Sequence, residues 1–313
     1  MTAPPAPMTI VPSGHASRRA AAGALVAYAV LTSPAHATLP ASDPPLTHSW
    51  QLIDSVNWQI ISGAVEDAAV TDAAEGTRGT CPMGMVDVTG AMKRDSQLSV
   101  ETLQDTTCTE WISRNFPQRC ARFDAKRWQS LASGLASSAM HFCIDRFEYP
   151  NRRGAYPIIA ITFDEAAAVC SRDKKRLCTE DEWTFACEGK DALPYPYGYE
   201  RDATACVIDR SYRMFDADRL GPRDSPRAVA ELDRLWQGEP SGARASCRSP
   251  FGVYDLTGNI DEWTRATQPG RPSILKGGYW GPVRTRCRPS TRAHGTDFFF
   301  YQQGFRCCAD ATK

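Results

Sequence analysis

The stretch Phe251-Gly-Val-Tyr-Asp-Leu-Thr-Gly-Asn-Ile-Asp-Glu-Trp-Thr264 joins the end of an apolar strand to a tight loop rich in oxygen donors. Val253-Tyr254 is typical of a short strand, and Gly258-Asn259 favours a turn because both residues tolerate a positive φ. Asp255 and Glu262 place carboxylates on either side of that turn. Calcium prefers such a set of charged and carbonyl oxygens around a bend, although the loop lacks the longer EF-hand pattern. The residues alone therefore leave two interpretations open, a calcium loop or an acidic surface turn.

Four stretches of the chain, in order, resemble signatures of the formylglycine-generating enzymes, also called sulfatase-modifying factors. Lys175–Trp183 resembles KRLPTEAEWE, the opening stretch resembles GLYDMxGNVWEW, Leu275–Trp280 resembles LRGGSW, and Gly304–Cys307 resembles the closing GFRC. The resemblance covers residues 143–309. It implies a divergent member of this family with an α+β, C-type-lectin-like fold that has little regular secondary structure and many disulfides.

The resemblance also implies a structural calcium ion in the opening stretch. In the family the matching loop binds calcium through the side chains at Asp255 and Glu262 and the carbonyls at Gly258 and Ile260. A second calcium site of the family uses an asparagine, and Val207 stands at the matching position. We therefore expect one calcium ion, not two.

The N-terminal residues 1–37 resemble an export signal. Arg18-Arg19 precedes a short apolar run, and Ala35-His-Ala37 has the small-x-small pattern of a cleavage site. The run is too short for a transmembrane helix. We expect cleavage after Ala37 and a periplasmic or secreted protein, with the general secretory and twin-arginine routes both open and a disordered tail as the alternative.

Beyond the signal, residues 38–80 are rich in proline, alanine and acidic side chains. They are typical of a linker or mobile segment, or of a helix with Leu52, Ile53, Val56 and Ile60 on one face. We expect the folded domain over 81–313, with a disulfide-held helical insert at about 100–140 and the motif-bearing core at 143–309.

Two capping boxes predict helices within the core. Thr162-Phe-Asp-Glu165 and Thr179-Glu-Asp-Glu182 each place a threonine three residues before a glutamate, so each side chain can bond the other residue's backbone N–H. Upstream, His141 and Asp145 share a face if the segment is a strand. They are structural residues or, as the alternative, metal ligands.

The chain has 12 cysteines, all after residue 80. An even, high count in an exported chain indicates disulfides. Zinc is not expected, because no Cys-x2-Cys or His-x3-His spacing occurs. Proximity in the sequence suggests the pairs Cys108–Cys120 and Cys206–Cys247, and the resemblance implies Cys170–Cys307.

Cys187 and Cys287 decide whether the chain can have the family's copper-dependent activity. In the family, the cysteine at the position of Cys187 forms a disulfide with a cysteine whose position is occupied by Arg292 in this chain. We therefore expect Cys187 to form its disulfide with Cys287 instead. The family oxidises a peptide cysteine to formylglycine with O₂ and copper held by two cysteines. Their positions match Cys287 and Pro282, and proline cannot bind copper. A disulfide-bonded Cys287 offers no thiolate, so we expect no copper site and no formylglycine-generating activity.

Three function classes remain after this comparison. The preferred one is a binding or non-catalytic module; the others are a related oxidase with altered chemistry and a formylglycine-generating enzyme with a rearranged site that uses Cys287 as its catalytic residue. Lys+Arg and Asp+Glu both count 36, so charge favours neither nucleic acid nor an anionic membrane as partner. A peptide, protein or glycan suits the aromatic and charged residues of the C-terminal loops. The expected ligand surface comprises Tyr279, Trp280, Arg284, Arg286, His294 and Asp297; the alternative places Trp280 in the core and the arginines in solvent.

Overall fold

The computed structural model of the chain describes residues 46–54, 57–61, 80–95, 97–268 and 270–312. The predicted signal peptide and its cleavage point lie outside these residues. No helix within the described ranges is long and apolar enough to cross a membrane.

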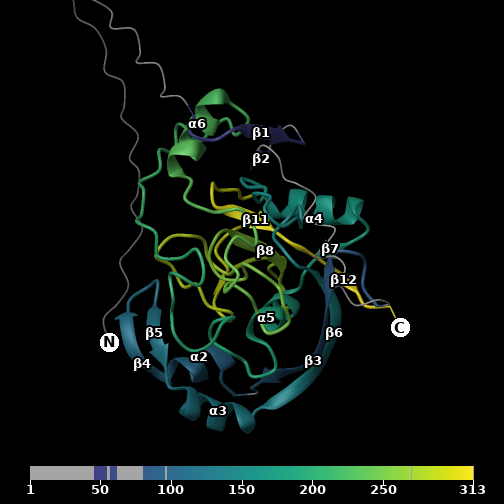
Figure 1. Cartoon of the computed structure of the whole chain (residues 1–313), viewed down its shortest axis with the longest axis vertical. Helices are drawn as coiled ribbons and strands as arrows, with labels where there is room; N and C mark the ends of the chain where they lie inside the picture. The colour runs from purple at the N-terminus through teal and green to yellow at the C-terminus, as the bar shows by residue number, and fades with distance from the viewer. Residues whose placement is uncertain (1–45, 55–56, 62–79, 96, 269, 313) are drawn as a thin grey trace, which may run out of the picture. The chain divides into compact units, whose positions relative to one another are not determined.

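The first four-stranded sheet is antiparallel throughout (Figure 1). Its order is β3-β6-β12-β7, with bounds Met85–Arg94, Ala136–Asp145, Cys307–Asp310 and Arg176–Leu177. β3 and β6 pair along their whole length, from Met85 opposite Asp145 to Arg94 opposite Ala136. The buried Val88, Phe142 and Ile144 hold this pair against the core.

The second sheet carries three of the four signature stretches. Its order is β10-β9-β8-β11, with bounds Ser290–Thr291, Ser273–Lys276, Asp261–Arg265 and Gln303–Phe305. β11 runs parallel to β8 and places Gly304 opposite Glu262, whereas β9 pairs with both of its neighbours in antiparallel fashion. The sheet therefore brings the opening stretch, the Gly-Gly segment and the C-terminal motif side by side.

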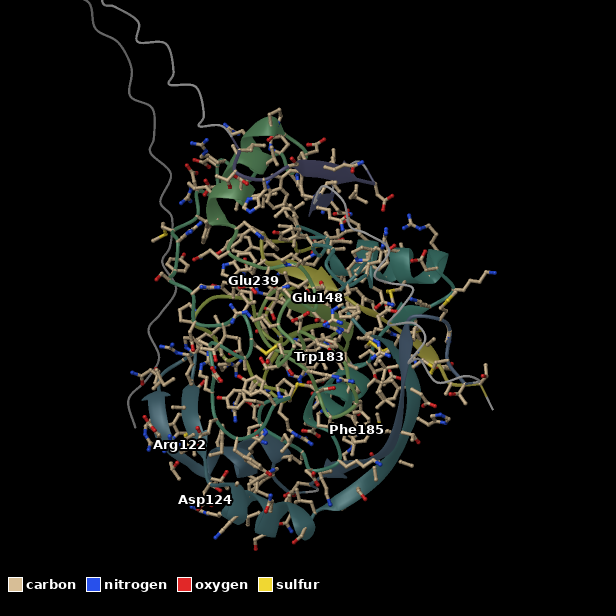
Figure 2. The ribbon with its side chains drawn as sticks, in the orientation of Figure 1. Arg122, Asp124, Glu148, Trp183, Phe185 and Glu239 are labelled. Carbon is tan, nitrogen blue, oxygen red and sulfur yellow. A yellow bond between two sulfur atoms is a disulfide. The ribbon has the colours of Figure 1, made fainter. Side chains whose placement is uncertain are left out.

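Two helices begin at the predicted capping boxes. In α4 (Phe163–Arg172) and α5 (Glu180–Glu188) the cap threonine and the following glutamate exchange hydrogen bonds with each other's backbone. α5 buries Trp183, Phe185 and Cys187 against both sheets. Figure 2 shows Trp183 and Glu148 among the inner side chains, whereas Arg122 and Asp124 lie by β5 and α3.

Within the expected linker at 38–80, of which only residues 46–54, 57–61 and 80 are described, a hairpin forms around residue 50 in place of a helix. β1 (Trp50–Ile53) pairs with β2 (Asn57–Ile60), and Trp58 exchanges two backbone hydrogen bonds with Ile159 at 3.2 and 2.9 Å. Asp233 of α6 (Pro226–Leu235) accepts bonds from residues 47, 48 and 50. Cross-strand pairing and this carboxylate override the weak helical pattern, so the fold takes in residues well before 81.

The insert contains a hairpin as well as the expected helices. α2 (Val100–Asp105) and α3 (Ala125–Ser133) flank β4 (Cys108–Ser113) and β5 (Arg119–Phe123), which pair antiparallel. Phe116 at the hairpin turn has 75% of its surface exposed. The insert thus has the expected helices and the Cys108–Cys120 disulfide, together with a hairpin that the sequence did not predict.

All 12 cysteines form disulfides, and four of these disulfides are the pairs expected from the sequence. Cys307 and Cys308 alternate sides of β12, and each bonds a different element of the core. The six bonds are Cys81–Cys143, Cys108–Cys120, Cys170–Cys307, Cys178–Cys308, Cys187–Cys287 and Cys206–Cys247.

Candidate functional site

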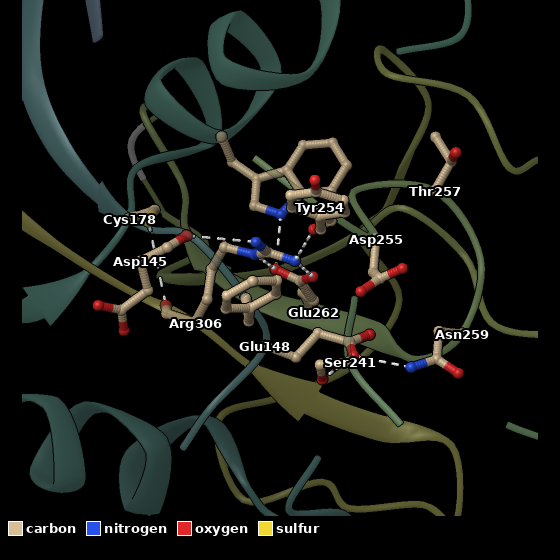
Figure 3. A network of polar contacts seen from close by, with 12 residues as sticks. Asp145, Glu148, Cys178, Ser241, Tyr254, Asp255, Thr257, Asn259, Glu262 and Arg306 are labelled. Atoms are coloured by element: carbon tan, nitrogen blue, oxygen red, sulfur yellow. Dashed lines mark hydrogen bonds and ion pairs between the residues drawn. The ribbon is translucent and has the colours of Figure 1, made fainter. Parts of the chain in front are cut away.

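A buried ion pair occupies the centre of the signature stretches. Glu262 accepts two hydrogen bonds from Arg306, Nη2 to Oε1 at 2.6 Å and Nε to Oε2 at 2.7 Å, and one from the indole of Trp183 at 2.8 Å (Figure 3). The Arg306 guanidinium also donates to the carbonyl of Tyr254 at 2.9 Å. Both charged side chains are fully buried, so each depends on the other for its charge balance.

Two further carboxyl groups lie close to this pair. Glu148 Oε2 accepts from Ser241 Oγ at 2.8 Å and from Asn259 Nδ2 at 2.7 Å, whereas its Oε1 is buried with no partner among the described residues. Burial, followed by the charges of Asp255 and Glu262, raises the pKa of Glu148 well above its usual range. Burial likewise raises the pKa of Asp255 to about 7, and its Oδ2 accepts from Gly242 N at 2.6 Å. Ionisation of these two groups is therefore less favourable in this centre than in solvent.

One of the predicted calcium ligands, Glu262, is paired with a guanidinium in this arrangement. Both oxygens of Glu262 already accept charge-assisted bonds from Arg306, and a calcium ion at the loop would have to share that carboxylate with a buried guanidinium. Arg306 balances Glu262, whereas Glu148 and Asp255 form no ion pair with any of the described residues. Within the described ranges no group of three metal-binding side chains of the His, Cys, Asp or Glu type is suitably placed.

The alternative metal ligands His141 and Asp145 contact different partners. His141 Nε2 lies 3.2 Å from Asp87 Oδ1, and Asp145 Oδ1 accepts from Lys175 Nζ at 2.6 Å. Asp145 also accepts from the backbone N–H of Cys307 at 3.0 Å. These bonds favour the structural interpretation of both residues.

A cavity of about 190 Å³ lies on the other side of β8 from the ion pair. Successive residues of a strand point to opposite faces, so Glu262 enters the core while its neighbour Asp261 lines this cavity. The walls come from the β4–β5 turn, the Gly-Gly segment and the loops before β10 and β11. The lining residues are Phe116, Pro117, Asp261, Leu275, Gly277, Gly278, Tyr279, Val283, Arg284, Pro289, Ser290, Thr291, His294 and Gln302.

Gly278 shapes the floor of the cavity. Its φ is +70°, and an added Cβ would lie 2.8 Å from the Cγ2 of Thr285, so only glycine fits this position. Its backbone N–H donates to Asp261 Oδ1 at 3.0 Å. Burial raises the pKa of Asp261 to about 7, and the Gly278 bond opposes this shift.

The structure divides the expected ligand surface into three groups. Tyr279, Arg284 and His294 line the cavity. Trp280 is buried against Trp236, with ring centroids 4.8 Å apart, and Arg286 is buried against Asp105 at 2.7 Å. Asp297 is exposed and does not line the cavity.

Sequence reasoning missed Asp261, Phe116 and Gln302. A signal for Asp261 was present, because it stands where the family signature has tryptophan in GNVWEW. Phe116 had no such signal, since only the fold brings the insert to the Gly-Gly segment.

Cys287 lies in the core and not on the cavity wall. It is fully buried, bonds Cys187 of α5, and its backbone N–H donates to the carbonyl of Pro194 at 3.0 Å. Neither it nor Pro282 lines the cavity.

Comparison with known proteins identifies the family. Residues 68–311 match the model of the sulfatase-modifying factor enzyme 1-like domain. The chain belongs to this family. This sulfatase-modifying factor family member is 29% identical over 181 residues to the inactive C-alpha-formylglycine-generating enzyme 2 of Mus musculus, and the match covers 50% of each chain. It is 25% identical to the formylglycine-generating enzyme of Mus musculus, over 50% of this chain and 45% of the relative.

The chain spans about half the length of the curated relatives it matches. Among solved structures, the crystal structure of CarF aligns with a TM-score of 0.44 at 13% identity, over 73% of this chain and 98% of CarF.

Proposed function

We propose that this sulfatase-modifying factor family member is an exported, non-catalytic binding protein that takes its ligand in the cavity beside Asp261. The observation that carries the proposal is the state of the cysteines. All 12 are bonded, Cys287 lies buried in a disulfide, and proline occupies the position of the other copper ligand. Copper(I) prefers two soft thiolates, and this chain has none to offer in its oxidised form.

The relatives are consistent with this proposal. One group is named inactive C-alpha-formylglycine-generating enzyme 2, and the other is named formylglycine-generating enzyme. The alternative, an O₂-dependent oxidoreductase that uses Cys287, requires reduction of the Cys187–Cys287 bond and exposure of a buried sulfur. The six disulfides support export, because such bonds persist in oxidising compartments.

The experiment incubates the oxidised full chain with copper, O₂ and a cysteine-containing peptide, and follows the peptide by mass spectrometry. We expect no conversion of cysteine to formylglycine. A matched variant, Pro282→Cys combined with Cys187→Ala, restores thiols at positions 282 and 287 and tests whether the site can gain copper binding. Conversion of the peptide by the unmodified protein would overturn the proposal.

A further inference from the structure

Asp261 is an acidic group on a cavity floor with no ionic partner. Its hydrogen bond comes from a neutral backbone donor, Gly278 N–H, and none of the described residues forms an ion pair with it. Arg284 and Lys276 act on this carboxylate through space without forming an ion pair with it, so it gains free energy when a positively charged group binds directly.

The two cations nearest to the cavity are engaged elsewhere. Arg284 donates to the carbonyl of Ser290 at 3.0 Å and stacks on Phe116, with its guanidinium 5.1 Å from the ring centroid. It also lies 3.8 Å from a carboxylate oxygen of Glu101. Lys276 Nζ is buried and donates to the carbonyl of Arg288 at 2.7 Å and to Ser290 Oγ at 3.3 Å.

A second acceptor lies beside Asp261. The backbone N–H of Asp261 donates to the carbonyl of Gln302 at 2.9 Å, and both residues line the cavity. Gln302 Oε1 is buried and has no hydrogen-bond partner within the described part of the chain. Gln302 therefore brings an amide acceptor to the lining of the same cavity, which suits a donor with several N–H groups.

The remaining walls favour a cation with an apolar stem. Tyr279 presents an aromatic ring, whose face attracts ammonium and guanidinium groups, whereas Arg284 already stacks on Phe116. Burial lowers the pKa of His294, so its ring adds no positive charge near neutral pH. The volume of about 190 Å³ corresponds to roughly six water molecules, so one side-chain-sized group fits.

We propose that the cavity binds a ligand carrying an ammonium or guanidinium group, with Asp261 as its anchor and Gln302 as a second acceptor. This inference rests on the proposed binding function and names the chemistry of the ligand. The group comes either from a small free amine or from a lysine or arginine side chain of a partner peptide.

The test is calorimetry on the full chain with its disulfides intact. The probes are n-butylamine, n-butylguanidine, and acetylated tripeptide amides with lysine, arginine or norleucine at the centre. We expect cationic probes to bind at least about tenfold more tightly than the norleucine peptide. If the small amines and the cationic peptides both bind, a free amine is sufficient as the ligand. If only the cationic peptides bind, the ligand is a side chain of a peptide partner.

Asp261→Asn should weaken binding of the cationic probe at least about tenfold, because the amide keeps the shape of the carboxylate and loses its charge. Asp164→Asn is the matched control, since Asp164 is exposed and does not line the cavity. The amide resonance of Gly278 should shift on binding to the unmodified chain, because this N–H contacts Asp261.

Equal binding of norleucine and lysine peptides, unchanged affinity in Asp261→Asn, or no binding of any cationic probe would overturn the inference. These outcomes are independent of the peptide-oxidation assay. A chain that binds no cation and oxidises no cysteine loses this inference and keeps the non-catalytic assignment.

Discussion

Asp261 and Glu262 are consecutive carboxylates on β8 with opposite environments. Glu262 meets the guanidinium of Arg306 in the core, whereas Asp261 faces a cavity and accepts a bond from a neutral N–H. The two residues are adjacent in the sequence, and they face opposite sides of the sheet because successive side chains of a strand alternate. The comparison shows that one strand can place a stabilising carboxylate in the core on one face and a carboxylate that is available for a ligand on the other face.

The largest expected difference is in stability. Glu262→Gln leaves Arg306 buried without its counter-charge, so we expect the free energy of unfolding to fall by about 3–5 kcal/mol. Asp261→Asn removes a carboxylate that has no ionic partner, and we expect no loss of stability. Urea denaturation of the two variants compares neighbouring isosteric changes directly. Similar losses in both would contradict the division of roles between the two faces.

The second effect concerns the loop that closes the cavity. Cys187→Ala combined with Cys287→Ala removes the bond that fixes the residues just before Pro289 and Ser290, and we expect a loss of about 2–5 kcal/mol. The pair Cys108–Cys120 spans 12 residues instead of 100. Its removal is the control and should cost less, because the stabilisation grows with the length of the closed loop. A larger loss for the shorter bond would point to strain or packing instead of chain entropy.

The third effect is a pH dependence of the free energy of unfolding, to which carboxyl groups on both sides of β8 contribute. A carboxyl whose pKa is raised in the folded state binds its proton more tightly there, so stability is full below the unfolded pKa and declines as pH rises through the folded value. The pKa values of about 7 at Asp255 and Asp261 place this decline between about pH 4 and 7, at about 1.4 kcal/mol per pKa unit before partial exposure of Asp261 is considered.

Asp255→Asn should flatten the pH profile of unfolding more than Asp261→Asn does, since Asp255 is the more buried group. Stability measured by urea denaturation across this range provides the comparison. A pH profile that Asp255→Asn leaves unchanged would contradict a raised pKa of this group in the fold.

The smallest expected effect is that of calcium. Because Arg306 already neutralises Glu262, we expect a chelator to leave the melting temperature unchanged and added calcium to leave it unchanged as well. A saturable rise of the melting temperature with calcium would restore the loop of Asp255, Gly258, Ile260 and Glu262 as a metal site.

The sequence by itself determined the family, the fold class and the two capped helices, because these depend on ordered motifs and local hydrogen bonding. It also gave the bond between Cys187 and Cys287, from the loss of the usual partner at Arg292 and the need to pair an even number of cysteines. Strand alternation along residues 261–265 would have assigned the two carboxylates to opposite faces.

The tertiary structure alone decided what each carboxylate meets. Arg306 lies 44 residues from Glu262 in the chain, and Phe116 lies more than 140 residues from Asp261. Local patterns cannot report such distant contacts, and a loop of acidic residues looks the same whether a metal ion or a guanidinium neutralises it. Packing of β11 beside β8 places Arg306 next to Glu262, a contact that no local pattern in the sequence reports.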